Sequence, residues 1–294
     1  MPKLNSGSRY YPIIAALIAL AFYFLLVITI SLILMSPPVR AGVLKYFWTI
    51  DTQIPDEFIT RNFSLTHILC LITTLLCITA ALFVFRTQSE LNKKRILQVL
   101  VIMMVGSEII DWTWYVVIGH YSLRNCLPLH LCSFSIFIEF AAIFSMRSAL
   151  LKEFTYSLSM PAALAALITP GWYYPIISFQ YLQSLLTHSF LILIPVLIVW
   201  GTGFRPNYTR LPKCFLMLLL LTGIAASANA VFGGNYMFLS YVPQDTTLQV
   251  FEQWFGHPGY ILPVIILIFI IWFFLYLPWI LADRKRRRKA VEKT

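Results

Sequence analysis

The chain has 294 residues, of which 59% are hydrophobic and only 12% are charged, and its net charge is +10. This composition excludes a soluble globular domain, because apolar runs long enough to cross a bilayer recur along the whole chain. The basic residues lie in short segments between these runs and in the tail, so the positive charge does not indicate nucleic-acid binding.

The apolar runs predict an all-α, polytopic membrane protein with about eight transmembrane helices in one domain, residues 1–294. A transmembrane barrel is excluded, because its strands would alternate apolar and polar residues. The first run follows Lys3 and Arg9 but is too long for a signal peptide, so we expect an uncleaved span. The predicted spans are about 13–35, 65–85, 96–118, 127–146, 154–169, 180–200, 215–232 and 258–281, and a basic tail follows at 282–294.

The distribution of basic residues predicts the orientation. With eight spans, both chain ends share one side with the second, fourth and sixth loops. Only Arg40, Lys45, Arg61 and Arg124 fall on the opposite side; all other Lys and Arg residues lie on the side of the chain ends. Basic loops stay in the cytoplasm, so we predict a cell-membrane protein with cytoplasmic N- and C-termini. Its basic tail is expected to contact anionic lipid headgroups.

The stretch Cys126-Leu-Pro-Leu-His-Leu-Cys132 opens the fourth predicted span. Pro128 suits the first turn of a helix, which places His130 and Cys132 on the opening turn. A thiolate near a helix N-terminus and a His is stabilised there, so Cys132 is the candidate nucleophile. The alternative is a small, buried, apolar Cys. Cys126 could form a disulfide, although five Cys imply no disulfide framework.

Two His residues are candidates for the base that would activate this thiol. His130 and Cys132 are two residues apart, so they point to roughly opposite faces of an ideal helix, whereas Cys132, Ser135 and Glu139 share one face. If that face lines the site, His188 in the sixth span is the better base. The alternative for His188 is a hydrogen-bonded packing role.

The third predicted span carries Glu108 and Asp111, which lie on one helix face because they are three residues apart. Ionisable residues inside a membrane indicate a functional site by default. The alternative is a structural pairing with a neighbouring His or with Arg124.

The predicted topology brings polar residues from five spans into the extracytoplasmic half, which indicates one cavity that opens outward. The loop from Gly233 to His257 lacks Lys and Arg and is expected to cover the mouth of that cavity. No metal-ligand spacing and no nucleotide motif is present, so we predict no metal and no cofactor. The catalytic candidates are Cys132, His188, His130 and Glu108; the substrate-binding candidates are His67, Asp111, Asn229, Asn235, Tyr236 and Gln183.

These residues also carry a family resemblance. The stretch Leu127-Pro-Leu-His-Leu-Cys132 resembles the hallmark of the bacterial YwaF-type integral membrane family. Further matches, over about residues 60–280, are His67, Glu108, Thr187-His188, Gly234 to Leu239, Pro243 and Gly256 to Leu262. The family is similar at a distance to a eukaryotic transmembrane acyltransferase that remodels ether phospholipids through a Cys and a His. The resemblance implies that either His130 or His188 is that His.

The sequence therefore predicts an acyltransferase or acyl-ester hydrolase that acts on membrane lipids from the outer leaflet. Cys132 would form a thioester, and Asn229, Asn235 and the Gly233-Gly234 backbone would donate hydrogen bonds to the oxyanion. The competing hypothesis is a transporter or flippase, in which Glu108, Asp111 and His residues bind protons or a cation. A third is a non-catalytic membrane assembly protein.

Overall fold

The computed structural model describes residues 11–145, 148–171, 173–244 and 246–291, and this part of the chain is helical without any β-strand. Two five-residue π-turns, η4 (Thr155–Ser159) and η5 (Leu197–Gly201), continue α-helices. Short 3₁₀ turns lie at Val43–Tyr46, Asp51–Gln53, Asp56–Phe58, Tyr208–Arg210 and Tyr236–Phe238. The α-helices are α1 (Tyr11–Leu34), α2 (Pro37–Gly42), α3 (Leu65–Arg86), α4 (Glu90–Val117), α5 (Leu131–Ser145), α6 (Ala149–Phe154), α7 (Met160–Ile168), α8 (Phe179–Val196), α9 (Leu211–Phe232), α10 (Thr247–Phe255) and α11 (Ile261–Val291).

Six of the described helices are long and apolar enough to cross a membrane: α1, α3, α4, α8 with its π-turn, α9 and α11. The helix α5 is apolar but shorter, and α6, η4 and α7 follow one another without a break. These helices confirm the predicted class, an all-α polytopic membrane protein.

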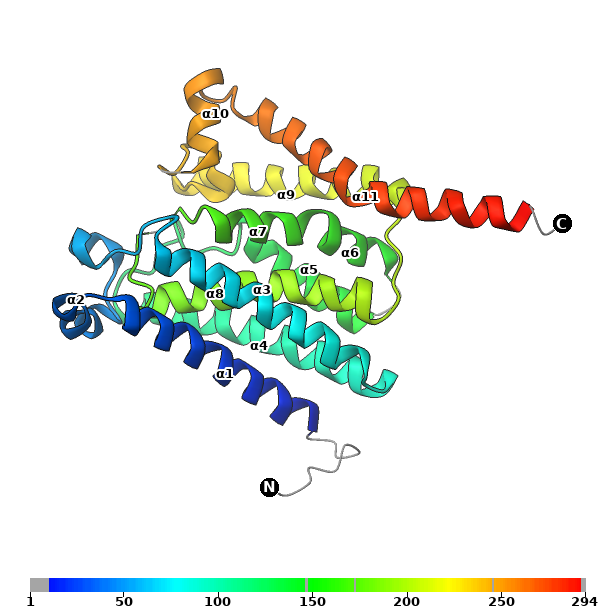
Figure 1. The fold of residues 1–294 in the computed structure, drawn as a ribbon. Helices are drawn as coiled ribbons and strands as arrows, with labels where there is room; N and C mark the ends of the chain where they lie inside the picture. The colour runs from blue at the N-terminus through cyan, green and yellow to red at the C-terminus, as the bar shows by residue number, and fades with distance from the viewer. Residues whose placement is uncertain (1–10, 146–147, 172, 245, 292–294) are drawn as a thin grey trace.

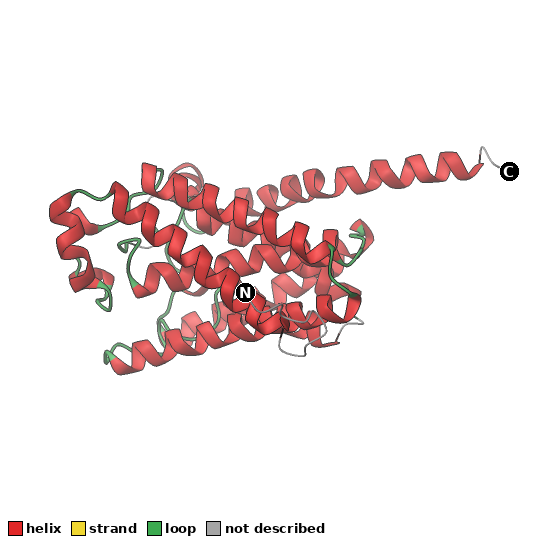
Figure 2. Ribbon diagram, turned by 60° about the horizontal axis from the view of Figure 1, so that its bottom comes forward, coloured by secondary structure: helices red, strands yellow, loops and turns green. Residues whose placement is uncertain are grey.

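The long helices lie side by side and pack as a bundle, with α1 on one side and α9 and α11 on the other (Figure 1). One end of the bundle carries α2 and α10, and we call it the α10 end. The first turn of α1 and the last turns of α11 both lie at the opposite end (Figure 1). We call it the basic end, because α11 carries Arg284, Lys285 and Arg286 there. Beyond the other helices, α11 continues alone (Figure 2).

Local sequence explains where several helices begin. The hydroxyl oxygens of Ser64, Ser89 and Ser178 accept hydrogen bonds from backbone N–H groups in the first turns of α3, α4 and α8. These serines act as N-caps, which satisfy donors that a helix end leaves unpaired. At the other end of α9, Gly233 adopts a left-handed conformation (φ +67°) that turns the chain into the next loop.

Three predicted boundaries differ from the structure. The fourth span was expected to include Pro128 in its first turn, but α5 begins at Leu131 and the preceding residues form a bent segment. The fifth predicted span begins earlier, at Ala149, and contains the π-turn η4. The predicted tail is a continuation of α11 up to Val291, and its last residues, 292–294, lie outside the described part.

A buried ion pair connects the helices at the basic end. Glu153 on α6 is fully buried and accepts a hydrogen bond from the Arg210 guanidinium, with 2.8 Å between Oε2 and Nη1. The Tyr276 hydroxyl on α11 and the backbone N–H of Asn207 also donate to Glu153. These bonds connect α6 to the segment before α9 and to α11, and they supply the partners that a buried carboxylate needs.

Candidate functional site

Glu108 and Cys132 lie beside each other where α4 packs against α5. The Glu108 side chain is only 8% exposed, and it forms a hydrogen bond with the Ser133 side chain on the first turn of α5. Cys132 is close enough to Glu108 to feel the charge of its carboxyl group, and it packs against the hydrophobic core. A thiol and a carboxyl group from different helices therefore lie near each other inside the bundle.

Hydrogen bonds between α4 and α8 fix the position of the acidic helix face. The hydroxyl oxygens of Ser107 and Thr187 are 3.2 Å apart. Gln183 Nε2 donates to Thr187 Oγ1 over 3.3 Å, which joins Gln183 to the same contact. Gln180 Nε2 donates to Asp111 Oδ1 over 2.6 Å. Asp111 is thus held by α8, while Glu108 is held by α5.

The same contact determines the direction of His188. The helices α4 and α8 run in opposite directions (Figure 1). Consider two antiparallel helices that touch through one residue each. The next residue in each helix points to the same side of the helix pair, because both helices are right-handed. Glu108 follows Ser107 and His188 follows Thr187, so both turn toward one neighbour. That neighbour is α5, because Glu108 meets Ser133 there, and α5 also packs against α8.

The His188 ring is buried, with 9% of the residue exposed. Its Nδ1 lies 2.7 Å from the carbonyl oxygen of Ser184 and 3.1 Å from the Ser184 hydroxyl. A ring nitrogen that faces a carbonyl oxygen must carry a proton, so Nδ1 of His188 is an N–H donor. This contact also fixes the orientation of the ring.

His130 lies just before α5 and is covered by the loop after α9. The backbone N–H of Met237 donates to His130 Nδ1 over 3.3 Å. The rings of Tyr236 and Phe238 lie against the imidazole, with centroid distances of 5.6 and 5.2 Å. His130 therefore anchors this loop to the start of α5.

The loop that covers His130 is held by its own amide side chains. The Asn229 side chain accepts from the backbone N–H of Tyr236 over 2.7 Å and donates to the Tyr236 carbonyl over 3.0 Å. Asn235 makes equivalent bonds to the backbone of Ser240 and Tyr241. Both amide groups are already hydrogen-bonded, so the geometry does not support the predicted oxyanion role. They shape the loop instead.

Tyr236 joins this loop to the segment before α5. Its hydroxyl donates to the Leu123 carbonyl over 2.7 Å and accepts from the Leu127 backbone N–H over 2.9 Å. The side chain is fully buried. This bridge ties the bent segment before α5 to the loop after α9.

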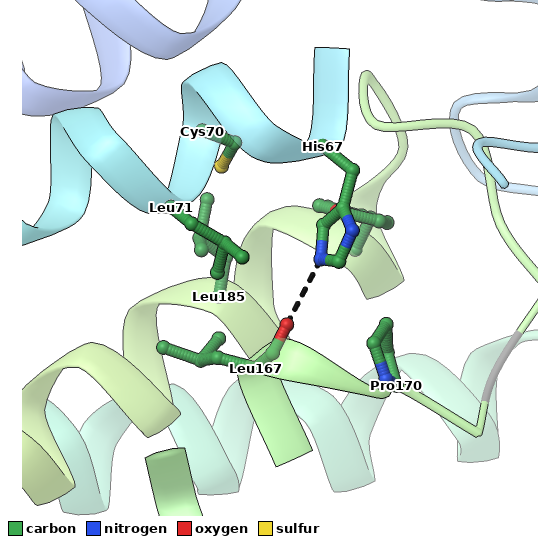
Figure 3. A pocket seen from close by; sticks show the side chains of 7 residues that line it. His67, Cys70, Leu71, Leu167, Pro170 and Leu185 are labelled. Carbon is green, nitrogen blue, oxygen red and sulfur yellow. Dashed lines mark hydrogen bonds between the residues drawn. The ribbon is translucent and has the colours of Figure 1, made fainter. Parts of the chain in front are cut away.

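His67 lies in a separate place, between α3 and α7 (Figure 3). Its Nδ1 accepts from the Phe63 backbone N–H over 2.9 Å, so Nε2 carries the proton and donates to the Leu167 carbonyl, also over 2.9 Å. The ring lines a cavity of about 10 Å³ together with Cys70, Leu71, Leu167, Pro170, Tyr181 and Leu185. The prediction of one cavity shared by His67 with Glu108 and Cys132 is therefore wrong.

The structure thus divides the predicted residues into three groups. The first contains Cys132, Glu108 and His188, with Asp111 and Gln183 beside them on α4 and α8. The second is the loop group, which contains His130, Asn229, Asn235 and Tyr236, and the third is His67. Sequence reasoning missed Ser107 and Ser133. In the sequence, these two serines stand out only because each is directly next to a predicted site residue, Glu108 or Cys132.

The described residues do not indicate a metal site. No group of three or more His, Cys, Asp or Glu side chains that could hold a metal ion is found among them. The five cysteines, Cys126 among them, are free thiols.

Comparison with known proteins identifies the family of this chain. No curated protein and no solved structure matches the chain. The profile of the TMEM164 family matches residues 62–276, which is more than half of the chain and includes all three groups of residues. The chain therefore belongs to the TMEM164 family.

Proposed function

We propose that this membrane protein is an acyltransferase or acyl-ester hydrolase that acts on lipids, with Cys132 as its nucleophile. The observation that carries the proposal is the proximity of the Cys132 thiol to the buried Glu108 carboxyl at the first turn of α5. A thiol becomes a strong nucleophile when a neighbouring group accepts its proton. The resemblance described above supports an ester of a lipid as the substrate.

The first half of the reaction forms a thioester. Cys132 Sγ attacks the ester carbonyl of the lipid, its proton passes to the neighbouring base, and the lysolipid alkoxide leaves with a proton from the same base. Glu108 is the acidic group beside the thiol, and His188 turns toward the same helix. Glu108 and His188 together are therefore the proposed acid–base pair, and His130 holds the covering loop.

The second half of the reaction releases the acyl chain. The hydroxyl group of a second lipid attacks the thioester carbonyl in a transferase, and water attacks it in a hydrolase. In both cases the base takes the proton of the attacking hydroxyl group or water and passes it to the sulfur, which leaves as the thiol. The Ser133 hydroxyl, next to Cys132 and bound to Glu108, is placed to orient that pair.

The proposed site belongs to the outer leaflet. The basic end of the bundle carries the described basic residues that follow α3, precede α9 and extend α11. Basic loops remain cytoplasmic, so the α10 end faces outward and both termini face inward, with eight crossings of the cell membrane. Arg284, Lys285 and Arg286 are exposed on α11 and are placed to contact anionic headgroups.

The test is to incubate purified full-length protein with a phospholipid that carries a labelled acyl chain. The expected result is a hydroxylamine-labile acyl adduct on Cys132, found by peptide mass spectrometry. Cys132→Ala should lose the adduct, whereas Cys126→Ala, a change six residues away in the same motif, should keep it. Absence of any adduct, together with unchanged lipid turnover in Cys132→Ala, would remove the covalent mechanism.

A further inference from the structure

Glu139 is a buried acid that the proposed reaction does not use. It lies near the middle of α5 and is fully buried. Neither of its carboxyl oxygens has a hydrogen-bond partner in the part of the chain that the structure describes. A carboxylate without water or a partner is strongly unfavourable inside a membrane, so this side chain points to a missing ligand.

Ser159, in the π-turn η4, has a second buried oxygen without a partner. Ser159 lies one turn before Ala163, which belongs to the same core cluster as Ile136 and Ile143 on α5. Glu139 lies three residues after Ile136 and four residues before Ile143, so it shares their face of α5. Both side chains therefore face the core between α5, α7 and α8.

The depths of the two residues also agree. The helices α5 and α6 are antiparallel neighbours joined by a short turn, so depth can be counted from Ser145 and Ala149. Glu139 lies about 9 Å from that end and Ser159 about 15 Å, a difference of about one helical turn. Helical side chains lean toward the N-terminus of their own helix, so in an antiparallel pair these two side chains lean toward each other.

A third oxygen at this depth comes from α8. Pro195 lies inside this helix and has no N–H, so the carbonyl of Leu191 loses its usual intrahelical donor. Leu191 is fully buried in the same core cluster as Ile136, Ile143 and Ala163. Pro161 gives a parallel case: the carbonyl four residues earlier, in Ser157, is instead bound by Trp272 Nε1 over 2.9 Å.

We propose that Glu139 binds a monovalent metal cation such as Na⁺ inside the membrane, together with the Ser159 hydroxyl and the Leu191 carbonyl. Oxygen ligands suit hard cations, and one carboxylate neutralises one positive charge. Helices interrupted by proline or by π-turns supply backbone oxygens to such sites. This proposal is independent of the Cys132 reaction, because the site lies two turns further along α5.

The test uses N,N′-dicyclohexylcarbodiimide, an apolar reagent that reacts with protonated carboxyl groups in membranes. Purified full-length protein is labelled in Na⁺, K⁺ or choline at equal ionic strength, and modification of Glu139 is followed by peptide mass spectrometry. A bound cation keeps the carboxyl ionised and blocks it. Labelling of Glu139 should be about tenfold slower when the protective cation is at ten times its Kd than in choline.

Thermal unfolding provides a second readout. The cation should raise the Tm of the wild-type protein, and Glu139→Gln should remove this cation dependence. Ser159→Ala keeps the carboxylate and should need more cation for the same rise, which covers the case in which Glu139→Gln does not fold. Glu153 is the internal control, since its carboxylate is already paired with Arg210 and its labelling should not respond to Na⁺. Equal labelling and equal Tm in all three salts would overturn the proposal.

Discussion

The hydroxyl oxygens of Ser107 and Thr187 are 3.2 Å apart, and this contact sets the register between α4 and α8. Each residue directly precedes a proposed acid–base group, Glu108 or His188. A shift of either helix would therefore move one of these groups away from α5.

Thr187→Val keeps the shape of the side chain but removes the hydroxyl from this contact. The expected result is a slower rate of acyl-adduct formation on Cys132, by about tenfold or ~1.4 kcal/mol in the barrier, because the groups are less well positioned. Ser107→Ala should have a similar effect, and the double variant should be no slower than either single variant, since one contact is lost. Thr113→Val is the control, as Thr113 bonds only within α4. Additive losses would contradict this role.

His67 should contribute to stability and not to the reaction. His67→Phe removes the hydrogen bond to Phe63, just before α3, and the bond to Leu167, which connects α3 to α7. It should lower the free energy of unfolding by about 2 kcal/mol, because two backbone groups lose their partner. Thermal unfolding in detergent measures this change, and the exposed His120→Ala should leave the Tm unchanged. A folded His67→Phe protein that no longer forms the Cys132 adduct would show that His67 belongs to the site.

Local sequence predicted the helical class and the helix faces on which several polar residues lie. The spacing of Glu108 and Asp111 placed both on one face of α4, and the structure shows both bonded to neighbouring helices. Periodicity also placed Glu139 on the face of Cys132, and both contact the interior. These predictions depend only on helical geometry, which one segment determines.

The incorrect predictions concern contacts between distant segments. Pro128 has the local features of a first helical turn, but the Tyr236 hydroxyl, more than a hundred residues away, binds the neighbouring Leu127 N–H. The roles of His67 and Asn229 likewise depend on backbone groups of other segments. A single sequence does not show which backbone groups lack a partner after folding, so these roles could not be predicted.

Asn229 should hold the covering loop closed. Asn229→Ala removes both hydrogen bonds to the Tyr236 backbone, and the amide of Tyr236 should exchange with solvent faster as a result. Hydrogen exchange with mass spectrometry on peptides from 230–244 measures the change. Ser227→Ala, two residues earlier and exposed on the same helix, should leave this exchange at the wild-type rate. Unchanged exchange in Asn229→Ala would mean that the hydrogen bonds of this loop to His130 and Leu123 are sufficient to hold it closed, which would contradict the prediction.

Cys126 should react slowly with maleimide. It lies in the loop before α5, and burial raises the pKa of its thiol above the ordinary value. Only the thiolate reacts, so a raised pKa leaves less of the reactive form at neutral pH, and the rate should increase as the pH rises. A variant with Cys126 as its single cysteine can be compared with one in which Asn125→Cys, an exposed neighbour, supplies the single thiol. Equal rates at neutral pH would contradict the burial of Cys126.

Glu108 and Asp111 provide the sharpest comparison, because two acids one turn apart on α4 have different partners. Glu108 lies beside the Cys132 thiol, whereas Asp111 is bound by Gln180. Glu108→Gln keeps the size of the side chain but removes the proposed acceptor of the thiol proton, so adduct formation should fall by about a hundredfold or more. Asp111→Asn keeps a polar partner for Gln180 and should lower the rate by less than about tenfold. Single-turnover labelling of Cys132 separates the two outcomes. If Asp111→Asn is the slower variant while Glu108→Gln is near wild type, the base is on the α8 side of α4, and the assignment of Glu108 is wrong.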